Sequence, residues 1–217
     1  MAVTRAKPVT LGDLLALEDH DRLEILNGEI VEKTVSSVDH AYVERKLGGL
    51  VDPFTYRSGS PKGPGGWWIF TEIHTCYDSG EVYCHDLAGS RRDRLPARPV
   101  NEYMKITPDW VCEIVSPGHE KRDFVDKFKT LQQAAVPHYW LVHPEEKMLI
   151  VYRWSKEGYI VIQRATVGEV VRAEPFDAIE LSVSELLGIE DEEVVEDAPE
   201  EAVVHEPMGK GPRRLDG

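Results

Sequence analysis

The stretch PDWVCEIVSP, residues 108–117, places a single carboxylate inside a short apolar strand. Glu113 is flanked by a nearly continuous apolar run, typical of a strand buried on both faces: Trp110, Val111, Cys112, Ile114 and Val115. An ionised carboxylate in such a place costs on the order of several kcal/mol unless a cation, a metal ion or hydrogen-bond donors meet it. The groups that meet Glu113 therefore decide what this strand does.

Composition bounds the class of protein. The chain has 217 residues, 41% of them hydrophobic and 29% charged, which indicates one soluble globular domain with room for a tail. No run of about 18 apolar residues is present, so a membrane span is excluded, and the N-terminus lacks the apolar stretch of a secretory signal. The three cysteines form no disulfide framework, and we expect a reducing cytoplasm.

The net charge of −14 divides evenly between two parts of the chain. Residues 190–217 carry ten acidic and three basic residues, and the remainder also has a net charge of −7. We expect a folded domain over residues 1–189 and a disordered acidic tail over 190–217. An acidic body disfavours nucleic acid as a partner, because Lys and Arg carry phosphate binding.

Local patterns predict an α/β arrangement. Thr10 and Asp13 form a capping box that begins a helix, and Asn27-Gly28 lies between two short strands in a type I′ hairpin. Further helices are expected over 38–52 and 121–136, and further strands over 67–73, 80–89, 110–115, 138–143, 148–154 and 159–165. Strand, helix and strand over 110–143 form a right-handed βαβ unit with parallel strands.

A second carboxylate is expected beside Glu113. Asp109 lies four residues away, roughly 13 Å along a strand, too far to share one ion. Asp86 is expected at the end of the strand EVYCHD, where an adjacent strand brings carboxylates to about 5 Å. Two such carboxylates repel each other unless a cation lies between them, and hard oxygen ligands suit Mg²⁺.

A lysine is the other expected member of the site. The helix after Glu113 has an apolar stripe of Phe124, Phe128, Leu131 and Ala135. Lys127 flanks this stripe, whereas Lys129 points toward solvent. A lysine beside a packed face must find an anion or extend to water, and Glu113 is the nearest candidate anion. Asp86, Glu113 and Lys127 together suit metal-dependent hydrolysis of a phosphodiester.

These residues resemble the PD-(D/E)XK nuclease superfamily and, within it, the bacterial family called Uma-type putative restriction endonucleases. The matching segments span about residues 10–187: RLEILNGEIVE, the helix starting with His40, HDLAG, PDWVCEIVSP, RDFVDKFKTLQQAAVPHYWLVHP and RAEPFDAIEL. The resemblance implies a restriction-endonuclease-like core, in which helices flank a central mixed sheet and a β-hairpin lies at the N-terminus. It also implies that Asp86 and Glu113 hold Mg²⁺ or Mn²⁺ in a DNA endonuclease.

The chain departs from the superfamily pattern at two positions. His85 stands where the motif has Pro, which we expect to matter little. Val115 stands where it has Lys, and Lys127 on the following helix is expected to replace that lysine. Glu24 corresponds to the acidic residue of the family's hairpin motif and is a further catalytic candidate, with His40 and Glu29 as additional ones. The basic residues after Asp86 could grip DNA phosphates: Arg91, Arg92 and Arg94.

Plainer interpretations remain open for each residue. Glu113 and Lys127 could form only a structural ion pair, Asp86 could be a turn residue, and His40 a core-edge histidine. Zinc is disfavoured because the cysteines include no CxxC pair. Two functional classes follow: a Mg²⁺-dependent DNA endonuclease, and a non-catalytic protein that keeps the nuclease fold to bind DNA or a protein. A cytoplasmic homodimer with DNA as partner is the expected setting.

Overall fold

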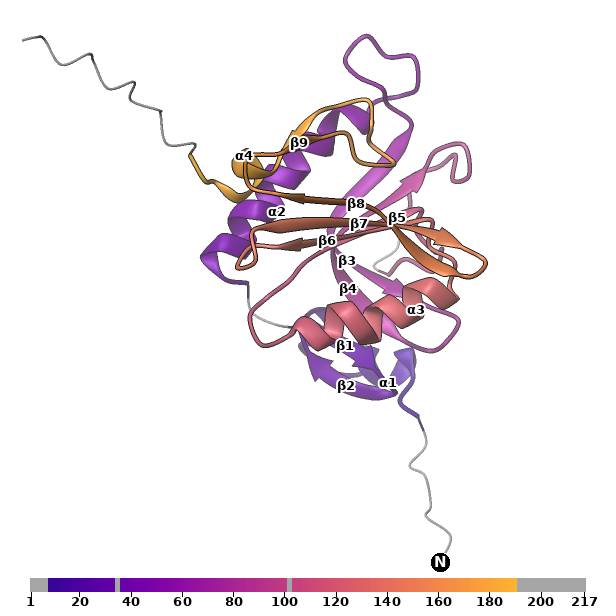
Figure 1. Cartoon of the computed structure of the whole chain (residues 1–217). Coiled ribbons are helices and arrows are strands. Elements are labelled where there is room, and N and C mark those ends of the chain that lie inside the picture. Colours follow the sequence, from indigo (N-terminus) through magenta and orange to yellow (C-terminus); the bar gives the residue numbers. More distant parts are fainter. Residues whose placement is uncertain (1–7, 34–35, 101–102, 191–217) are drawn as a thin grey trace, which may run out of the picture.

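The computed structural model describes residues 8–33, 36–100 and 103–190 (Figure 1). The acidic tail expected over 190–217 lies outside the described residues from position 191 on. The main strands are β1 (Leu23–Leu26), β2 (Glu29–Glu32), β3 (Trp67–Cys76), β4 (Val82–Arg91), β5 (Trp110–Ile114), β6 (His138–His143), β7 (Met148–Ser155) and β8 (Gly158–Thr166). The helices are α1 (Leu11–Leu15), α2 (Val38–Val51), α3 (Phe128–Gln133) and α4 (Val183–Leu187), with short helical turns η1 (His20–Arg22), η2 (Asp52–Phe54) and η3 (Arg122–Lys127) and a small pair, β9 (Val170–Val171) and β10 (Leu181–Ser182).

The central sheet is mixed, as predicted. Its strands run in the order β2-β1-β4-β5-β6-β7-β8, and β3 also pairs with β4. β5 and β6 are parallel, and the other pairs are antiparallel. Because parallel neighbours need a crossover, the chain passes over one face through η3 and α3 between these two strands. The expected βαβ unit is confirmed.

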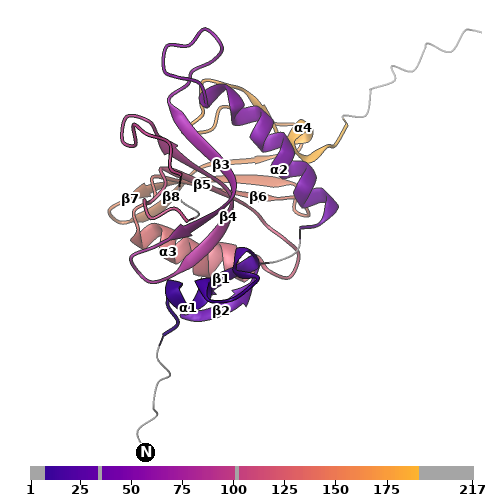
Figure 2. The same cartoon turned by 180° about the vertical axis from the view of Figure 1, so that it is seen from behind.

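Helices cover both faces of the sheet. Figures 1 and 2 show α2 and α4 on one side of β5–β8 and α3 on the other. Leu47 of α2 belongs to a core cluster with Cys112, whereas Leu131 of α3 belongs to a second cluster with Val111. Successive side chains of a strand point to opposite faces, so β5 is buried on both sides, as its apolar run predicts.

The N-terminal hairpin has the geometry that its sequence predicts. Asn27 and Gly28 have φ angles of 55° and 77°, both in the left-handed region that a type I′ turn requires. Thr10 caps α1 together with Asp13 in a reciprocal capping box. The β1 strand pairs with β4 where Ile25 faces Val82, and this contact ties the hairpin to the central sheet.

The helix expected over 121–136 differs in both its start and its end. Its first part, η3, is a π-helical turn, and α3 ends at Gln133. Ala135, expected on the apolar stripe, is exposed and lies beyond the helix with φ 56°. The amide of Val136 donates to the carbonyl of Leu131, as in a Schellman ending, and Pro137 follows.

Asp86 does not lie at the end of its strand, contrary to the expectation. β4 continues to Arg91, and the Leu87–Ser90 segment pairs with β3. Gly89, the last residue of the expected strand, lies inside it, where an added Cβ would come within 3.3 Å of the Trp67 and Trp110 rings. The glycine therefore permits close packing of indole rings rather than a chain reversal.

No helix within the described residues has the length and apolar content needed to cross a bilayer.

Candidate functional site

A pocket lies over β4 and β5, between the first turn of α2 and η3. Most of the residues that line it carry polar or charged side chains: Lys33, His40, Asp86, Glu113, Ile114, Ser116, His119, Arg122, Asp123 and Lys127. Four of them are residues that the sequence singles out as candidates, namely His40, Asp86, Glu113 and Lys127.

Asp86 and Glu113 come from neighbouring antiparallel strands. Leu87 pairs with Cys112, so the next step of the ladder brings Asp86 opposite Glu113. Both side chains are buried, both line the pocket, and the backbone amide of Ile114 donates to Asp86 Oδ2 at 2.7 Å. The two carboxylates therefore lie on the same face of the sheet.

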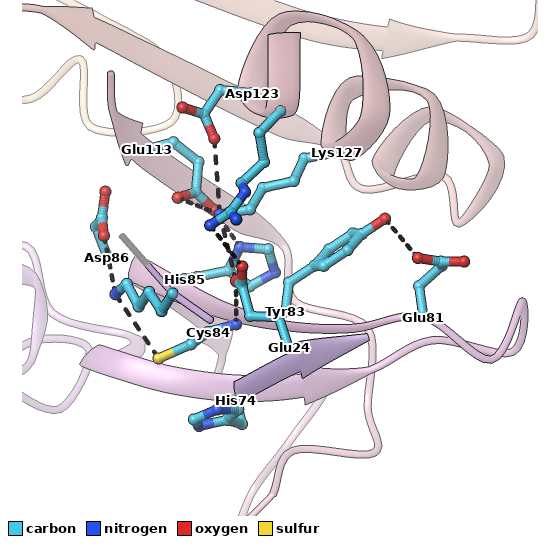
Figure 3. A network of polar contacts seen from close by, with 12 residues as sticks. Glu24, His74, Glu81, Tyr83, Cys84, His85, Asp86, Glu113, Asp123 and Lys127 are labelled. Atoms are coloured by element: carbon cyan, nitrogen blue, oxygen red, sulfur yellow. Dashed lines mark hydrogen bonds and ion pairs between the residues drawn. The ribbon is translucent and has the colours of Figure 1, made fainter. Parts of the chain in front are cut away.

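Two donors meet the Glu113 carboxylate (Figure 3). Lys127 Nζ donates to Oε2 at 2.8 Å, and His85 Nδ1 donates to Oε1 in a short hydrogen bond. His85 Nε2 in turn lies 2.6 Å from the Tyr77 hydroxyl. Burial alone would raise the pKa of Glu113, but Lys127 and His85 lower it below its ordinary value, so Glu113 stays ionised.

Lys127 is enclosed by three carboxylates. Besides Glu113, its Nζ lies 3.6 Å from Glu24 Oε1 and 3.7 Å from Asp123 Oδ1, and only 4% of the side chain is exposed. Burial would lower the pKa of Lys127, but these carboxylates raise it well above its ordinary value. Lys127 is therefore a permanent ammonium group, while Lys129 is exposed on the outer face, as expected.

Glu24 lies behind Lys127 rather than in the pocket lining. Its side chain is fully buried, its Oε1 accepts from the amide of Cys84 at 2.9 Å, and its Oε2 accepts from Arg122 Nη1 at 3.0 Å. Glu29, the other candidate of the hairpin, is exposed on β2 and does not line the pocket. The geometry places Glu24 where it positions Lys127 and Arg122.

Asp86 has a different set of neighbours. Lys33 Nζ lies 3.1 Å from Asp86 Oδ1, and His40 Nε2 lies 3.3 Å from the same oxygen. Burial would raise the pKa of Asp86, but His40 and Lys33 lower it well below its ordinary value. The Ser37 cap fixes the first turn of α2 and so the position of His40, whose Nδ1 lies 3.3 Å from Ser116 Oγ.

These groups fit a divalent cation. His40 is buried, and its Nε2 faces Asp86 Oδ1 at 3.3 Å but makes no hydrogen bond of normal geometry to any described residue. His40, Glu72 and Asp86 each offer one ligand atom, and these atoms all lie within 4.8 Å of one another. Two carboxylates and one imidazole suit Mg²⁺ or Mn²⁺. Glu113 is not a member of this group, and its oxygens accept from Lys127 and His85.

The three arginines expected to grip DNA have partners within the chain. Arg91 pairs with Asp93 at 2.9 Å on the surface, and Arg94 pairs with Asp109 at 2.9 Å. Arg92 stacks on the Trp68 ring at 3.6 Å and donates to the carbonyls of Trp67 and Thr55. None of these arginines is among the residues that line the pocket.

Sequence reasoning missed several neighbours of the carboxylates. Four of these neighbours belong to no motif that the sequence shows: Lys33, Glu72, Arg122 and Asp123. A fifth neighbour, His85, was expected to matter little. One available signal was the spacing of Asp123 and Lys127, since residues four apart on a helix are neighbours. Lys33 and Glu72 lie far apart in the sequence and meet only in the folded chain, which local patterns do not reveal.

Comparisons with known proteins agree with this fold. The family model Uma2, described as "putative restriction endonuclease", matches residues 11–184. A crystal structure of "a putative nuclease belonging to DUF820 from Anabaena variabilis ATCC 29413" has a TM-score of 0.66 at 19% sequence identity, covering 84% of this chain and 99% of that chain, which shows a shared fold. The DrdV–DNA complex has a TM-score of only 0.31 at 12% identity, over 57% of this chain and 9% of that chain. No curated protein matches. The family match spans most of the sequence, and the chain belongs to the Uma2 family of putative restriction endonucleases.

Proposed function

We propose that this protein is a metal-dependent endonuclease that hydrolyses DNA phosphodiester bonds. The observation that carries the proposal is the meeting of three groups in one pocket. The carboxylates of Asp86 and Glu113 come from adjacent strands, and the buried ammonium of Lys127 lies 2.8 Å from Glu113. Membership of the Uma2 family supports the same reaction.

Asp86 is the main candidate ligand for Mg²⁺ or Mn²⁺, with His40 beside it and Glu113 on the next strand. A bound divalent cation supplies charge stabilisation at the phosphate and lowers the pKa of bound water. Asp86 fits this role because its pKa is lowered well below the ordinary value, so the carboxylate is ionised at any working pH.

Lys127 takes the place of the motif lysine. Its ammonium reaches the pocket from η3, and Glu24 and Asp123 fix its position from behind. A fixed positive charge beside Glu113 would orient an attacking water and stabilise the negative charge that develops on the phosphate. Arg122 also lines the pocket and could add a contact to a phosphate oxygen.

A second candidate function is binding without catalysis. One observation favours it: each oxygen of Glu113 already accepts from a protein donor, as in a structural ion pair. Such a protein would keep the nuclease fold and bind DNA or a protein partner. The homodimer expected from the sequence stays a prediction under either function.

Nicking of closed circular plasmid DNA separates the two functions. Wild-type protein should nick the plasmid with Mg²⁺ or Mn²⁺ but not with EDTA, and Asp86→Asn and Glu113→Gln should lose this activity. Glu29→Gln is the matched control, since Glu29 is exposed and outside the pocket. Absence of nicking by wild-type protein with either ion would refute the nuclease, and retained binding of labelled DNA would then support the second function.

A further inference from the structure

Lys33 lies where a divalent cation would compete with it. Its Nζ is 3.1 Å from Asp86 Oδ1 and 2.5 Å from Glu72 Oε2. Asp86 and Glu72 are two of the three residues whose ligand atoms cluster with His40. The ammonium of Lys33 therefore contacts two of the three groups that would hold an ion.

The β3–β4 ladder explains why a cation is needed at this point. Thr71 pairs with Leu87 and Ile73 pairs with His85, so Glu72 stands across from Asp86 between these pairs. Glu72 has a φ of 48°, which is unusual for a residue with a side chain and is often found at functional sites. Carboxylates facing each other across two strands repel, and Lys33 offsets this repulsion.

Lys33 is the lysine of the site that can leave. Its side chain is 14% exposed and its partner Glu72 is 45% exposed, so the ammonium has a route to solvent. Its backbone amide donates to the carbonyl of Arg22 at 2.8 Å, which anchors the main chain while the side chain moves. Lys127, by contrast, is 4% exposed and enclosed by carboxylates.

We infer that Lys33 is a built-in counter-cation, which neutralises Asp86 and Glu72 in the metal-free protein and must leave Asp86 when a divalent cation binds. The inference rests on the proposed function, because it takes Asp86 as a ligand of that cation. Two positive charges a few ångströms apart repel strongly away from bulk water, so Lys33 and the ion exclude each other. The apparent metal affinity then measures an exchange of one cation for another.

Binding of Mn²⁺ alone tests this exchange without DNA. The signal of free Mn²⁺ in electron paramagnetic resonance gives the Kd for the full chain. Lys33→Met should bind Mn²⁺ at least about ten-fold more tightly than wild type, whereas Lys33→Arg, which keeps the charge, should stay near wild type. Lys129→Met is the matched control on the outer face and should change nothing. An unchanged or weaker affinity of Lys33→Met would overturn the inference.

A measurement on the wild type keeps the test open if Lys33→Met fails to fold. Reductive methylation followed by peptide mass spectrometry reports the accessibility of each lysine. Saturating Mn²⁺ should raise the modification of Lys33 severalfold and leave enclosed Lys127 protected. The inference is wrong if Lys33 reacts equally with and without the ion.

The outcomes also separate this inference from the proposed function. Tighter Mn²⁺ binding by Lys33→Met, together with no DNA cleavage by wild type, would reject the nuclease and leave the exchange standing. DNA cleavage by wild type, together with an unchanged Mn²⁺ affinity in Lys33→Met, would reject the exchange and leave the nuclease standing. No Mn²⁺ binding by either protein would reject the exchange and the metal site together.

Discussion

Lys127 Nζ lies 2.8 Å from Glu113 Oε2, although the two residues belong to a helix and to the strand that precedes it. This contact places an ammonium group beside the single carboxylate in the apolar run of β5. It serves both folding and the proposed chemistry, because removal of either charge leaves the other buried without its nearest opposite charge.

Replacement of Lys127 by Met should therefore affect both properties. We expect Mg²⁺-dependent plasmid cleavage to fall by orders of magnitude, and the free energy of unfolding to fall by about 3–5 kcal/mol, the cost of leaving a buried charge alone. Urea denaturation and a nicking assay measure the two effects. Lys129→Met should match wild type in both, and normal cleavage by Lys127→Met would refute its proposed role.

His85 should act on the reaction through Glu113. His85→Phe removes the donor to Glu113 Oε1 and also leaves the Tyr77 hydroxyl without its partner on His85. Where Glu113 acts as the second metal ligand of the proposed nuclease, loss of the group that orients it costs about 10–100-fold in activity. His85→Asn keeps a donor near the position of Nδ1 and should retain more kcat/KM than His85→Phe. Equal activity of the two variants and wild type would show that this hydrogen bond has no role in catalysis.

Asp123 should make the protein less stable as pH rises. Burial, together with Glu113, Asp86 and Glu24, raises the pKa of Asp123 from 3.8 to about 7, although Lys127 opposes the shift. The folded state thus holds a proton that the unfolded chain releases above about pH 4. This group then costs stability progressively from about pH 4 to pH 7, by at most about 1.4 kcal/mol per pH unit.

Asp123→Asn cannot ionise and tests this sign. It should be more stable than wild type at pH 8, and the difference should shrink toward zero near pH 4. Urea denaturation across this range measures the slope. A variant less stable than wild type at pH 8 would mean that the contact of Asp123 with Lys127 outweighs the burial of its charge.

Substitutions of Arg91 and Arg92 should separate an effect on DNA binding from an effect on stability. Arg92→Ala loses the Trp68 stacking and two hydrogen bonds to carbonyls, so stability should fall by about 1–3 kcal/mol. On the surface Arg91 pairs with exposed Asp93, and its guanidinium lies 6.0 Å from the Trp67 ring, so Arg91→Ala should lose much less stability than Arg92→Ala. If Arg91 contacts a phosphate, its loss should weaken DNA binding for all sequences and reduce the salt slope by about 1. Fluorescence anisotropy at several salt concentrations checks this, and an unchanged slope would remove Arg91 from the DNA surface.

The sequence anticipates those parts of the site that depend on local patterns. Asn27-Gly28 predicts its turn because few residue pairs accept two positive φ angles. The apolar run around Glu113 predicts a doubly buried strand, and helical spacing directs Lys127 toward it. These three features need only a period or a turn preference, both of which short segments contain.

Other parts depend on contacts that short segments do not contain. Lys33 directly follows β2, yet it contacts Asp86 of β4 and Glu72 of β3, which lie far from it in the sequence. The sequence around Gly89 does not tell whether the glycine ends a strand or makes room for indole rings inside one. The end of β4 was therefore misplaced. His85 looked like a neutral exchange for Pro, and its role became visible only with Tyr77 and Glu113 beside it.

The π-helical turn over Arg122–Lys127 gives the following helix its rotational phase. One residue added to or removed from an α-helix rotates everything after it by about 100°. The wider turn lets Lys127 face the carboxylates while Leu131 still packs against the sheet. In a regular α-helix the angle between these two side chains would be fixed by the rotation of about 100° per residue. The number of residues between Glu113 and Lys127 is therefore tied to the shape of this turn. An insertion or deletion of one residue within Arg122–Lys127 would turn either Lys127 or Leu131 away from its partners unless the backbone phase compensated.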